Sequence, residues 1–214
     1  MALNINGTTG ISGVDGSVSA PALTGTDSNT GITFPSADTI KFATGGVERM
    51  SITNSGFSGI IQGIQEFDSY YLSANKTADG IVDANWLRNN RAGAASQIGT
   101  GMSVSSGVFT FPSTGKYLVI TVGLFSLSGT DNIALDTQVT TDNSSYATHA
   151  RAQDGSKGSG SITGSGTSFS FVDVTDTSQV KVKFNLTSVG TSSYLAGNSN
   201  FLTTHLTFIR VGDT

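Results

Sequence analysis

The chain has 214 residues, with 27 Gly, 3 Pro, no Cys and a formal net charge of −4. The absence of Cys excludes disulfides and thiolate metal sites, and the scattered Lys and Arg residues argue against binding to nucleic acid. Frequent Thr, Val, Ile and Phe, with Glu only at Glu48 and Glu66, indicate an all-β protein. We expect no membrane insertion and no signal peptide, because neither pattern occurs.

Residues 1–30 are mostly Gly, Ser, Thr, Ala and Asp, with isolated apolar residues between them. This composition predicts an N-terminal attachment arm. A free arm of this kind would be disordered, whereas one docked on a neighbouring protein would be ordered. Leu3 and Ile5 alternate like the residues of an added strand, so we expect them to make the attachment.

Residues 31–64 contain short apolar pairs separated by turn residues such as Gly45-Gly46 and Asn54-Ser55-Gly56. Strands this short cannot close a core within one chain, but several copies wound together can bury their apolar sides. The segment therefore predicts an intertwined β shaft. The expected shaft interface consists of Ile32, Phe34, Ile40, Phe42, Met50 and Ile52.

Residues 65–214 change to longer strands with glycine-rich turns, which indicates a β-sandwich or jelly-roll head. Residues 116–125 are apolar on both faces, so they predict a central, doubly buried strand. Residues 154–167 read as a surface loop. The predicted strands are 70–73, 86–88, 102–104, 107–111, 116–125, 134–140, 168–174, 180–186 and 202–211.

Catalytic and metal-binding patterns are not found. His149 lies in an expected polar loop and His205 on the last strand, and they do not form a zinc motif. Five Asp residues flank strands, but without the spacing of a calcium loop: Asp131, Asp136, Asp142, Asp173 and Asp176. We therefore expect no catalytic residue, no metal site and no cofactor, with calcium and a paired-carboxylate glycosidase site as open alternatives.

The segment Gly107-Val-Phe109-Thr-Phe111 followed by Gly115-Lys-Tyr117 resembles the signature of complement globular-head and tumour-necrosis-factor-like jelly rolls. The resemblance covers roughly residues 65–214 and implies a homotrimeric jelly-roll head. The final strand departs from the family's usual ending. The residues that it implies for the head core or the trimer axis are Phe109, Phe111, Tyr117, Val119 and Phe208.

The stretch ALTGTDSNTGITFPSADTIKFATGGVERMSIT is similar to the opening of structural proteins of tailed bacteriophages, especially fibre and head-appendage proteins of marine and cyanobacterial phages. This resemblance implies a trimeric shaft and a location on the virion. The implied partners are further copies of the chain and the major capsid protein or a tail or portal protein. A bacterial surface glycan is a further expected ligand.

The combined prediction is a structural virion protein, either a fibre or spike or a capsid decoration (cement) protein, which adheres to the host or stabilises the particle. The candidate receptor loops contain Asp142, Tyr146 and Asn198, selected for their polarity. One alternative is a tail-fibre receptor-binding protein with depolymerase activity, although no long repetitive β-helix is evident. A cellular trimeric signalling ligand is a third alternative, which the missing signal peptide and Cys residues disfavour.

Overall fold

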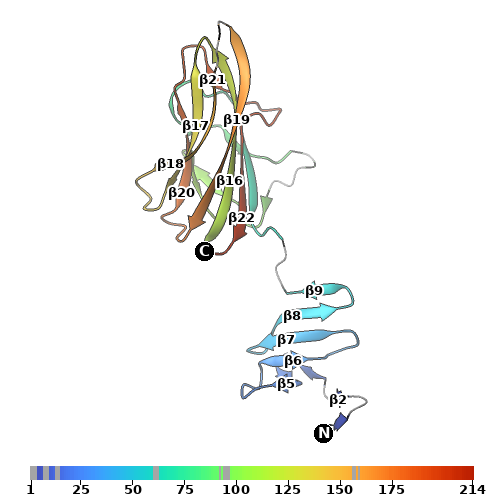
Figure 1. Cartoon of the computed structure of the whole chain (residues 1–214). Coiled ribbons are helices and arrows are strands. Elements are labelled where there is room, and N and C mark those ends of the chain that lie inside the picture. The colour runs from blue at the N-terminus through green and yellow to red at the C-terminus, as the bar shows by residue number, and fades with distance from the viewer. Residues whose placement is uncertain are drawn as a thin grey trace. The chain divides into compact units, whose positions relative to one another are not determined.

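The computed structural model describes residues 15–59, 63–91, 93, 97–155, 158 and 160–214, and the backbone alone of residues 4–6 and 10–12. The chain divides into two compact units, Met1–Gly63 and Ile64–Thr214. All regular elements in these ranges are strands (Figure 1), which confirms the predicted all-β class. No helix that could cross a membrane occurs among them. Leu3 and the side chain of Ile5 lie outside the described residues.

The N-terminal unit contains a five-stranded antiparallel sheet with its strands in chain order. Gly45 and Gly46, both at positive φ, make the tight two-residue turn between its third and fourth strands. Two short hairpins precede the sheet. The sheet strands are β5 (Leu23–Thr24), β6 (Gly31–Thr33), β7 (Ile40–Thr44), β8 (Val47–Thr53) and β9 (Gly56–Ser58), and the hairpins are β1 (Asn4–Asn6) with β2 (Gly10–Ser12) and β3 (Gly16–Ser17) with β4 (Ala20–Pro21).

One face of this sheet is covered by the chain itself. Thr33, Ala43 and Ser51 are buried there, and their small side chains let the preceding segment lie directly on the sheet. The Thr33 hydroxyl donates to the carbonyl of Asp15 at 2.7 Å, and the Phe34 N–H donates to the same oxygen. Residues 15–24 therefore fold with the sheet, whereas the sequence pattern predicted a separate arm through residue 30.

Five of the six expected shaft residues lie on the other face, since directly paired residues share one side of a sheet. Phe34, just beyond the end of β6, lines a depression together with Ile40 and Ile52. Ile32 pairs with Phe42 and Phe42 with Met50, while Ile40 pairs with Ile52. None of the six is fully buried, and Phe34 is 38 % exposed. Their role as an interface between copies stays a prediction.

The second unit is a sandwich of two antiparallel sheets, and its strand order confirms the predicted jelly roll. The β16 sheet has the order β12 (Trp86–Arg88), β10 (Phe67–Leu72), β22 (His205–Gly212), β16 (Gly115–Ser128) and β19 (Ser161–Val174), with β13 (Gln97–Ile98) and β21 (Tyr194–Leu195) beside it. The β17 sheet has the order β14 (Ser103–Ser105), β15 (Val108–Thr110), β20 (Lys181–Thr187), β17 (Asn132–Thr140) and β18 (Ala147–Gly155), with β11 (Gly80–Ile81) beside β20.

Aromatic side chains fill the space between the two sheets. The ring of Phe109 lies 5.1 Å from that of Tyr70, 5.6 Å from Phe184 and 5.3 Å from Phe208. The structure places all five residues that the resemblance assigned to the core or the axis in this core, each at most 2 % exposed: Phe109, Phe111, Tyr117, Val119 and Phe208. Their burial inside the sandwich leaves other residues to face any threefold axis.

Steric constraints explain why the two motif positions, Gly107 and Gly115, are glycine. Gly107 has φ of 76°, and a Cβ there would lie 2.5 Å from the carbonyl oxygen of Val82. Gly115 has φ of 139°, and its Cβ would lie 2.7 Å from the carbonyl oxygen of Gly212. Both values fall where residues with a side chain are strained, so each glycine is needed to start the strand that carries Phe109 or Tyr117.

Two predicted loops are wrong. The polar stretch with His149 forms strand β18, and β19 begins at Ser161, inside the expected loop 154–167. The glycines in that tract are needed because β18 crosses β19 closely: a Cβ on Gly166 would lie 2.5 Å from the backbone nitrogen of Gln153. Small residues therefore indicate close packing of two strands here, not a turn.

Replacement of Phe109 by Ala should lower the free energy of unfolding of the head by about 3–5 kcal/mol, because the cavity would lie at the centre of the aromatic core. Trp86, the single Trp of the chain, lies 6.1 Å from Phe109 ring to ring, so its fluorescence reports this core directly. Phe201→Ala, at a position 65 % exposed, is the control and should change stability by about 0.5 kcal/mol or less. Equal effects of the two substitutions would contradict this packing.

Candidate interaction surface

The outer face of the β16 sheet is apolar. Along β16 the side chains alternate, so Tyr117 and Val119 enter the core while Leu118 and Ile120 point outward. The strand register aligns outward residues into three rows across the sheet. The rows are Ile98, Phe67, Ile209, Leu118 and Phe171; then Ser69, Thr207, Ile120 and Phe169; then Leu87, Tyr71, His205, Val122 and Thr167.

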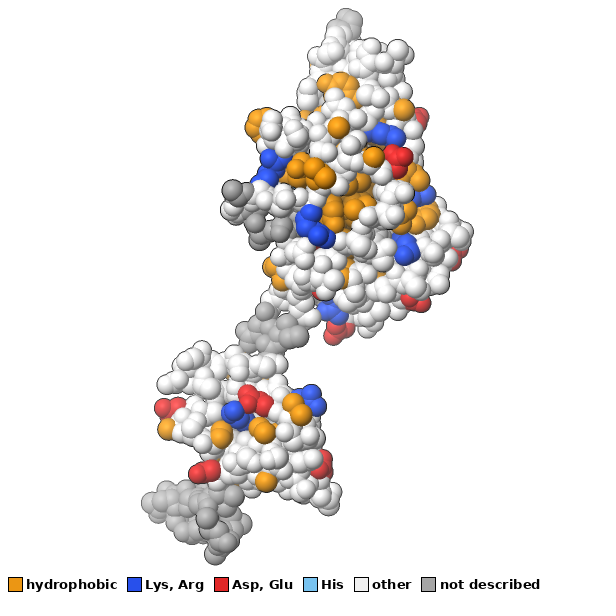
Figure 2. Space-filling model, turned by 180° about the vertical axis from the view of Figure 1, so that it is seen from behind, with side chains coloured by type: hydrophobic (Ala, Val, Ile, Leu, Met, Phe, Trp, Pro, Cys, Tyr) orange, Lys and Arg blue, Asp and Glu red, His pale blue; other side chains and the backbone are white. Residues whose placement is uncertain are grey.

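The margins of this face protrude into solvent. Phe169 and Phe171 on the edge strand β19 are 63 % and 70 % exposed, and Leu87 and Ile98 at the opposite margin are 47 % and 43 % exposed. Figure 2 shows hydrophobic side chains gathered at the surface of the head unit. No Asp, Glu, Lys or Arg occupies a position in the three rows. At the margin, the Arg91 guanidinium lies 4.6 Å from the centre of the Tyr71 ring, and Lys116 pairs with Asp173 in the adjoining row. We call these rows the apolar face of the head.

The outer face of the β17 sheet has the opposite character. Lys181, Lys183 and Asn185 point outward from β20. Asp136 accepts two hydrogen bonds from Arg151 at 2.6 and 2.9 Å, and the Lys183 ammonium lies 3.9 Å from the centre of the Tyr146 ring. A sandwich with water on both sides would be polar on both. The contrast marks the apolar face as an interaction surface.

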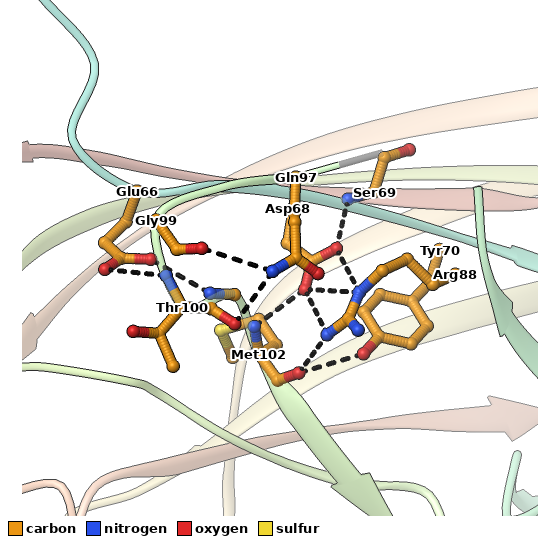
Figure 3. Close-up of polar contacts among 10 residues, drawn as sticks. Glu66, Asp68, Ser69, Tyr70, Arg88, Gln97, Gly99, Thr100 and Met102 are labelled. Atoms are coloured by element: carbon orange, nitrogen blue, oxygen red, sulfur yellow. Dashed lines mark hydrogen bonds and ion pairs between the residues drawn. The ribbon is translucent and has the colours of Figure 1, made fainter. Parts of the chain in front are cut away.

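A buried ion pair supports one margin of the apolar face. The carboxylate of Asp68, 1 % exposed, lies 3.0 Å from Arg88 and accepts the backbone N–H of Met102 at 2.7 Å (Figure 3). Arg88 also donates to the Met102 carbonyl, as does the Tyr70 hydroxyl. The hydrogen bond to Asp68 raises the pKa of Arg88, and burial raises the pKa of Tyr70. Arg88 therefore remains charged in the folded head.

Hydrogen bonds from neighbouring polar side chains also fix the conformation of the segment between β13 and β14. Glu66 accepts the backbone N–H groups of Thr100 and Gly101, and Gln97 donates its amide to the carbonyls of Gly99 and Thr100 (Figure 3). These bonds hold β13 against β10, which places Ile98 opposite Phe67 in the first apolar row. The polar network thus positions part of the apolar face.

Two of the three candidate receptor residues lie near each other. Asp142 accepts the Thr140 hydroxyl and the N–H groups of Ser144 and Ser145. Hydrogen bonds from the Ser145 N–H, which has the larger effect, and from the Thr140 hydroxyl hold the pKa of Asp142 well below its usual range. Tyr146 follows in the same loop. The Asp142 carboxylate is therefore engaged in shaping its own turn.

Asn198 lies elsewhere on the head. Its N–H donates to the Leu72 carbonyl, and its side-chain oxygen accepts the N–H groups of Asn200 and Phe201. The Asn198 segment lies beside Leu124 of β16, because the Ala196 N–H donates to the Leu124 carbonyl. The Asp142 loop lies near the other end of β16: its Asn143 N–H donates to the Gln179 carbonyl, a few residues after Val174, which pairs with Gly115. Nine residues of a strand span about 30 Å, so the three residues do not form one site.

The Asp residues considered for calcium are separated. Asp136 pairs with Arg151, Asp131 accepts the Ser193 hydroxyl, and Asp176 caps the N–H of Ser178. Among the described residues, no group of three His, Asp or Glu side chains could hold a metal ion. His149 is exposed on β18 and His205 is half-buried on the apolar face.

No protein-family model and no curated protein matches the chain. Solved structures do resemble it. Murine APRIL at pH 5.0 aligns with a TM-score of 0.52 and 14 % identity over 68 % of this chain and 98 % of that one. Eiger TNF from S. frugiperda aligns with a TM-score of 0.51 and 15 % identity over 72 % of this chain and 96 % of that one. These similarities confirm the tumour-necrosis-factor-like jelly roll, and at this identity they show the fold alone.

Replacement of Asp68 by Ala should cost about 2–4 kcal/mol, because it removes a buried carboxylate that accepts from two backbone N–H groups and from the partly exposed Arg88. Protease cleavage within 97–102 should also become faster than in the wild type. Asp213→Ala removes an exposed partner of Arg210 and should cost about 0–1 kcal/mol. Unchanged cleavage in Asp68→Ala would show that the network does not hold this segment.

Proposed function

We propose that the chain is a homotrimeric structural protein of a tailed-phage virion, a fibre, spike or capsid decoration protein whose head adheres to the host surface or stabilises the particle. The observation that carries this proposal is the apolar face of the head, whose charged neighbours lie at its margins. A protein that worked as a monomer would leave Phe169 and Phe171 in water. The geometry therefore favours an assembling protein over an isolated enzyme.

Copies of the same chain suit this face. In a ring of three copies, one part of the face meets a different part of the next copy, and the three rows contain no Asp, Glu, Lys or Arg that such a contact would bury without a partner. The resemblance to complement-head and tumour-necrosis-factor-like jelly rolls implies three copies. The polar face of the β17 sheet, with Lys181 and Lys183, then stays in water and is free for other contacts.

The virion location is supported by the N-terminal sequence. Residues 22–53 resemble the openings of phage fibre and head-appendage proteins, and they belong to the compact N-terminal unit Met1–Gly63. This organisation suits a protein held at its N-terminus by a capsid, tail or portal protein. Three heads on one attachment point would strengthen weak contacts to a bacterial surface glycan by raising their effective concentration.

A Phe171→Asp substitution tests the self-association. Burial of an unpaired carboxylate in the interface is costly, so the variant should elute from size exclusion as a single chain while Trp86 fluorescence stays native. Phe201→Asp is the control, since that residue is equally exposed outside the three rows. A Phe171→Asp variant that elutes with the wild-type trimer would overturn the assignment of this face.

The virion role has its own readout. Mass spectrometry of purified phage particles should detect this chain in the wild type, and particles made with Phe171→Asp should contain little of it, because a single chain forms only one weak attachment. Absence of the wild-type chain from particles, with a normal trimer in solution, would reject the virion role and keep the trimer.

A further inference from the structure

The third row of the apolar face contains a histidine. His205 begins β22, and the strand register places it between Tyr71 of β10 and Val122 of β16. Its ring is half-buried in the single chain. The other histidine of the chain, His149, is exposed on β18 in the opposite sheet. Of the two histidines, only His205 therefore lies on the face assigned to self-association.

A hydrogen bond to the backbone assigns the two ring nitrogens of His205 different roles. Nδ1 lies 3.3 Å from the carbonyl oxygen of Thr203. A carbonyl oxygen can only accept a hydrogen bond, so Nδ1 carries the hydrogen of the neutral ring and Nε2 carries the lone pair. Nε2 is thus the atom that takes up a second proton, and this uptake makes the ring a cation.

The side chains that flank His205 offer no negative charge to such a cation. From β10 it is faced by the Tyr71 phenol, and the Arg91 guanidinium lies 4.6 Å from the centre of that ring. From β16 it is faced by Val122. Tyr194 on β21 lies further along β16. The titratable or charged groups around His205 are therefore two phenols and one further cation.

A neighbouring copy of the chain offers no carboxylate from the face itself, because the three rows contain no Asp or Glu. The carboxylate at the margin, Asp173, lies beyond the first row and is paired with Lys116 on the adjacent strand. Assembly would therefore enclose a protonated His205 as an unpaired cation. Removal of an unpaired charge from water is far more costly than removal of a neutral ring.

We propose that His205 makes the assembly of the head dependent on pH, so that copies associate while its ring is neutral and separate when the ring takes up a proton. This inference rests on the proposed self-association through the apolar face. The assembled state binds fewer protons than the single chains, so assembly weakens as the pH falls. Three copies carry three rings, so each unit of pH below the titration of the ring can raise the dissociation constant of the trimer by up to about 1000-fold.

Sedimentation equilibrium of the full-length protein at about pH 8 and about pH 5.5 tests the proposal, because histidine is the side chain that ordinarily changes its charge in this interval. The wild type should have the mass of three chains at the higher pH and dissociate at the lower pH. His205→Gln keeps a polar, uncharged side chain and should stay trimeric at both. His149→Gln is the control and should dissociate like the wild type. Trp86 fluorescence should stay native throughout.

The outcomes separate this inference from the proposed trimer. A wild type that is equally trimeric at both pH values overturns the pH switch and keeps the trimer. A wild type that is a single chain at the higher pH overturns both. Equal dissociation of His205→Gln and the wild type on acidification also overturns the switch, because the proton would then act elsewhere. Loss of native Trp86 fluorescence together with dissociation overturns it as well, since the head would be unfolding.

Discussion

Strand β16 carries apolar side chains on both of its faces, and the architecture of the head follows from how each face is covered. Tyr117 and Val119 are enclosed within the sandwich, in the aromatic core around Phe109. Leu118 and Ile120 on the other side remain only half-buried in the single chain. Each Å² of apolar surface left in water costs roughly 25 cal/mol, so further copies of the chain that cover this face gain stability by doing so.

The N-terminal sheet meets the same constraint with shorter strands. Its small residues face the covering segment at Asp15, and its large apolar residues face outward. The two units thus share one physical feature, an apolar sheet face that the described residues of the single chain leave partly exposed. Polar surface such as the outer side of β20 is left for contacts with other molecules, and its Lys residues suit polar or anionic groups better than apolar ones.

Most of the head could be predicted from its sequence, because alternation and turn glycines are local signals. The motif with Gly107 and Gly115 predicted the jelly roll, and both glycines have the positive φ that explains them. Strand β18 was missed because Ala152 is its only fully buried residue, so it shows no apolar alternation. The network of Asp68 and Arg88 joins residues 20 apart in sequence and has no local signature.

The candidate interaction surface was only partly visible in the sequence. Residues 116–125 are apolar on both sides of the strand, and this pattern is the sequence signal of the surface. The pattern predicts a strand that is buried on both sides, and it does not show that one side is left partly exposed in the single chain. Phe169 and Phe171 lie within the predicted strand 168–174, yet only the register to Leu118 and Ile120 shows that they extend the same face. The receptor residues, chosen by polarity, are separated because loop position depends on topology.

The most direct test of the central claim, that copies of this chain cover its apolar faces, is the solution mass of the intact wild-type protein by light scattering over a dilution series. The account predicts three times the chain mass of 22.0 kDa, held down to micromolar concentrations. A mass of one chain at every concentration would contradict it, since both apolar faces would then stay in water.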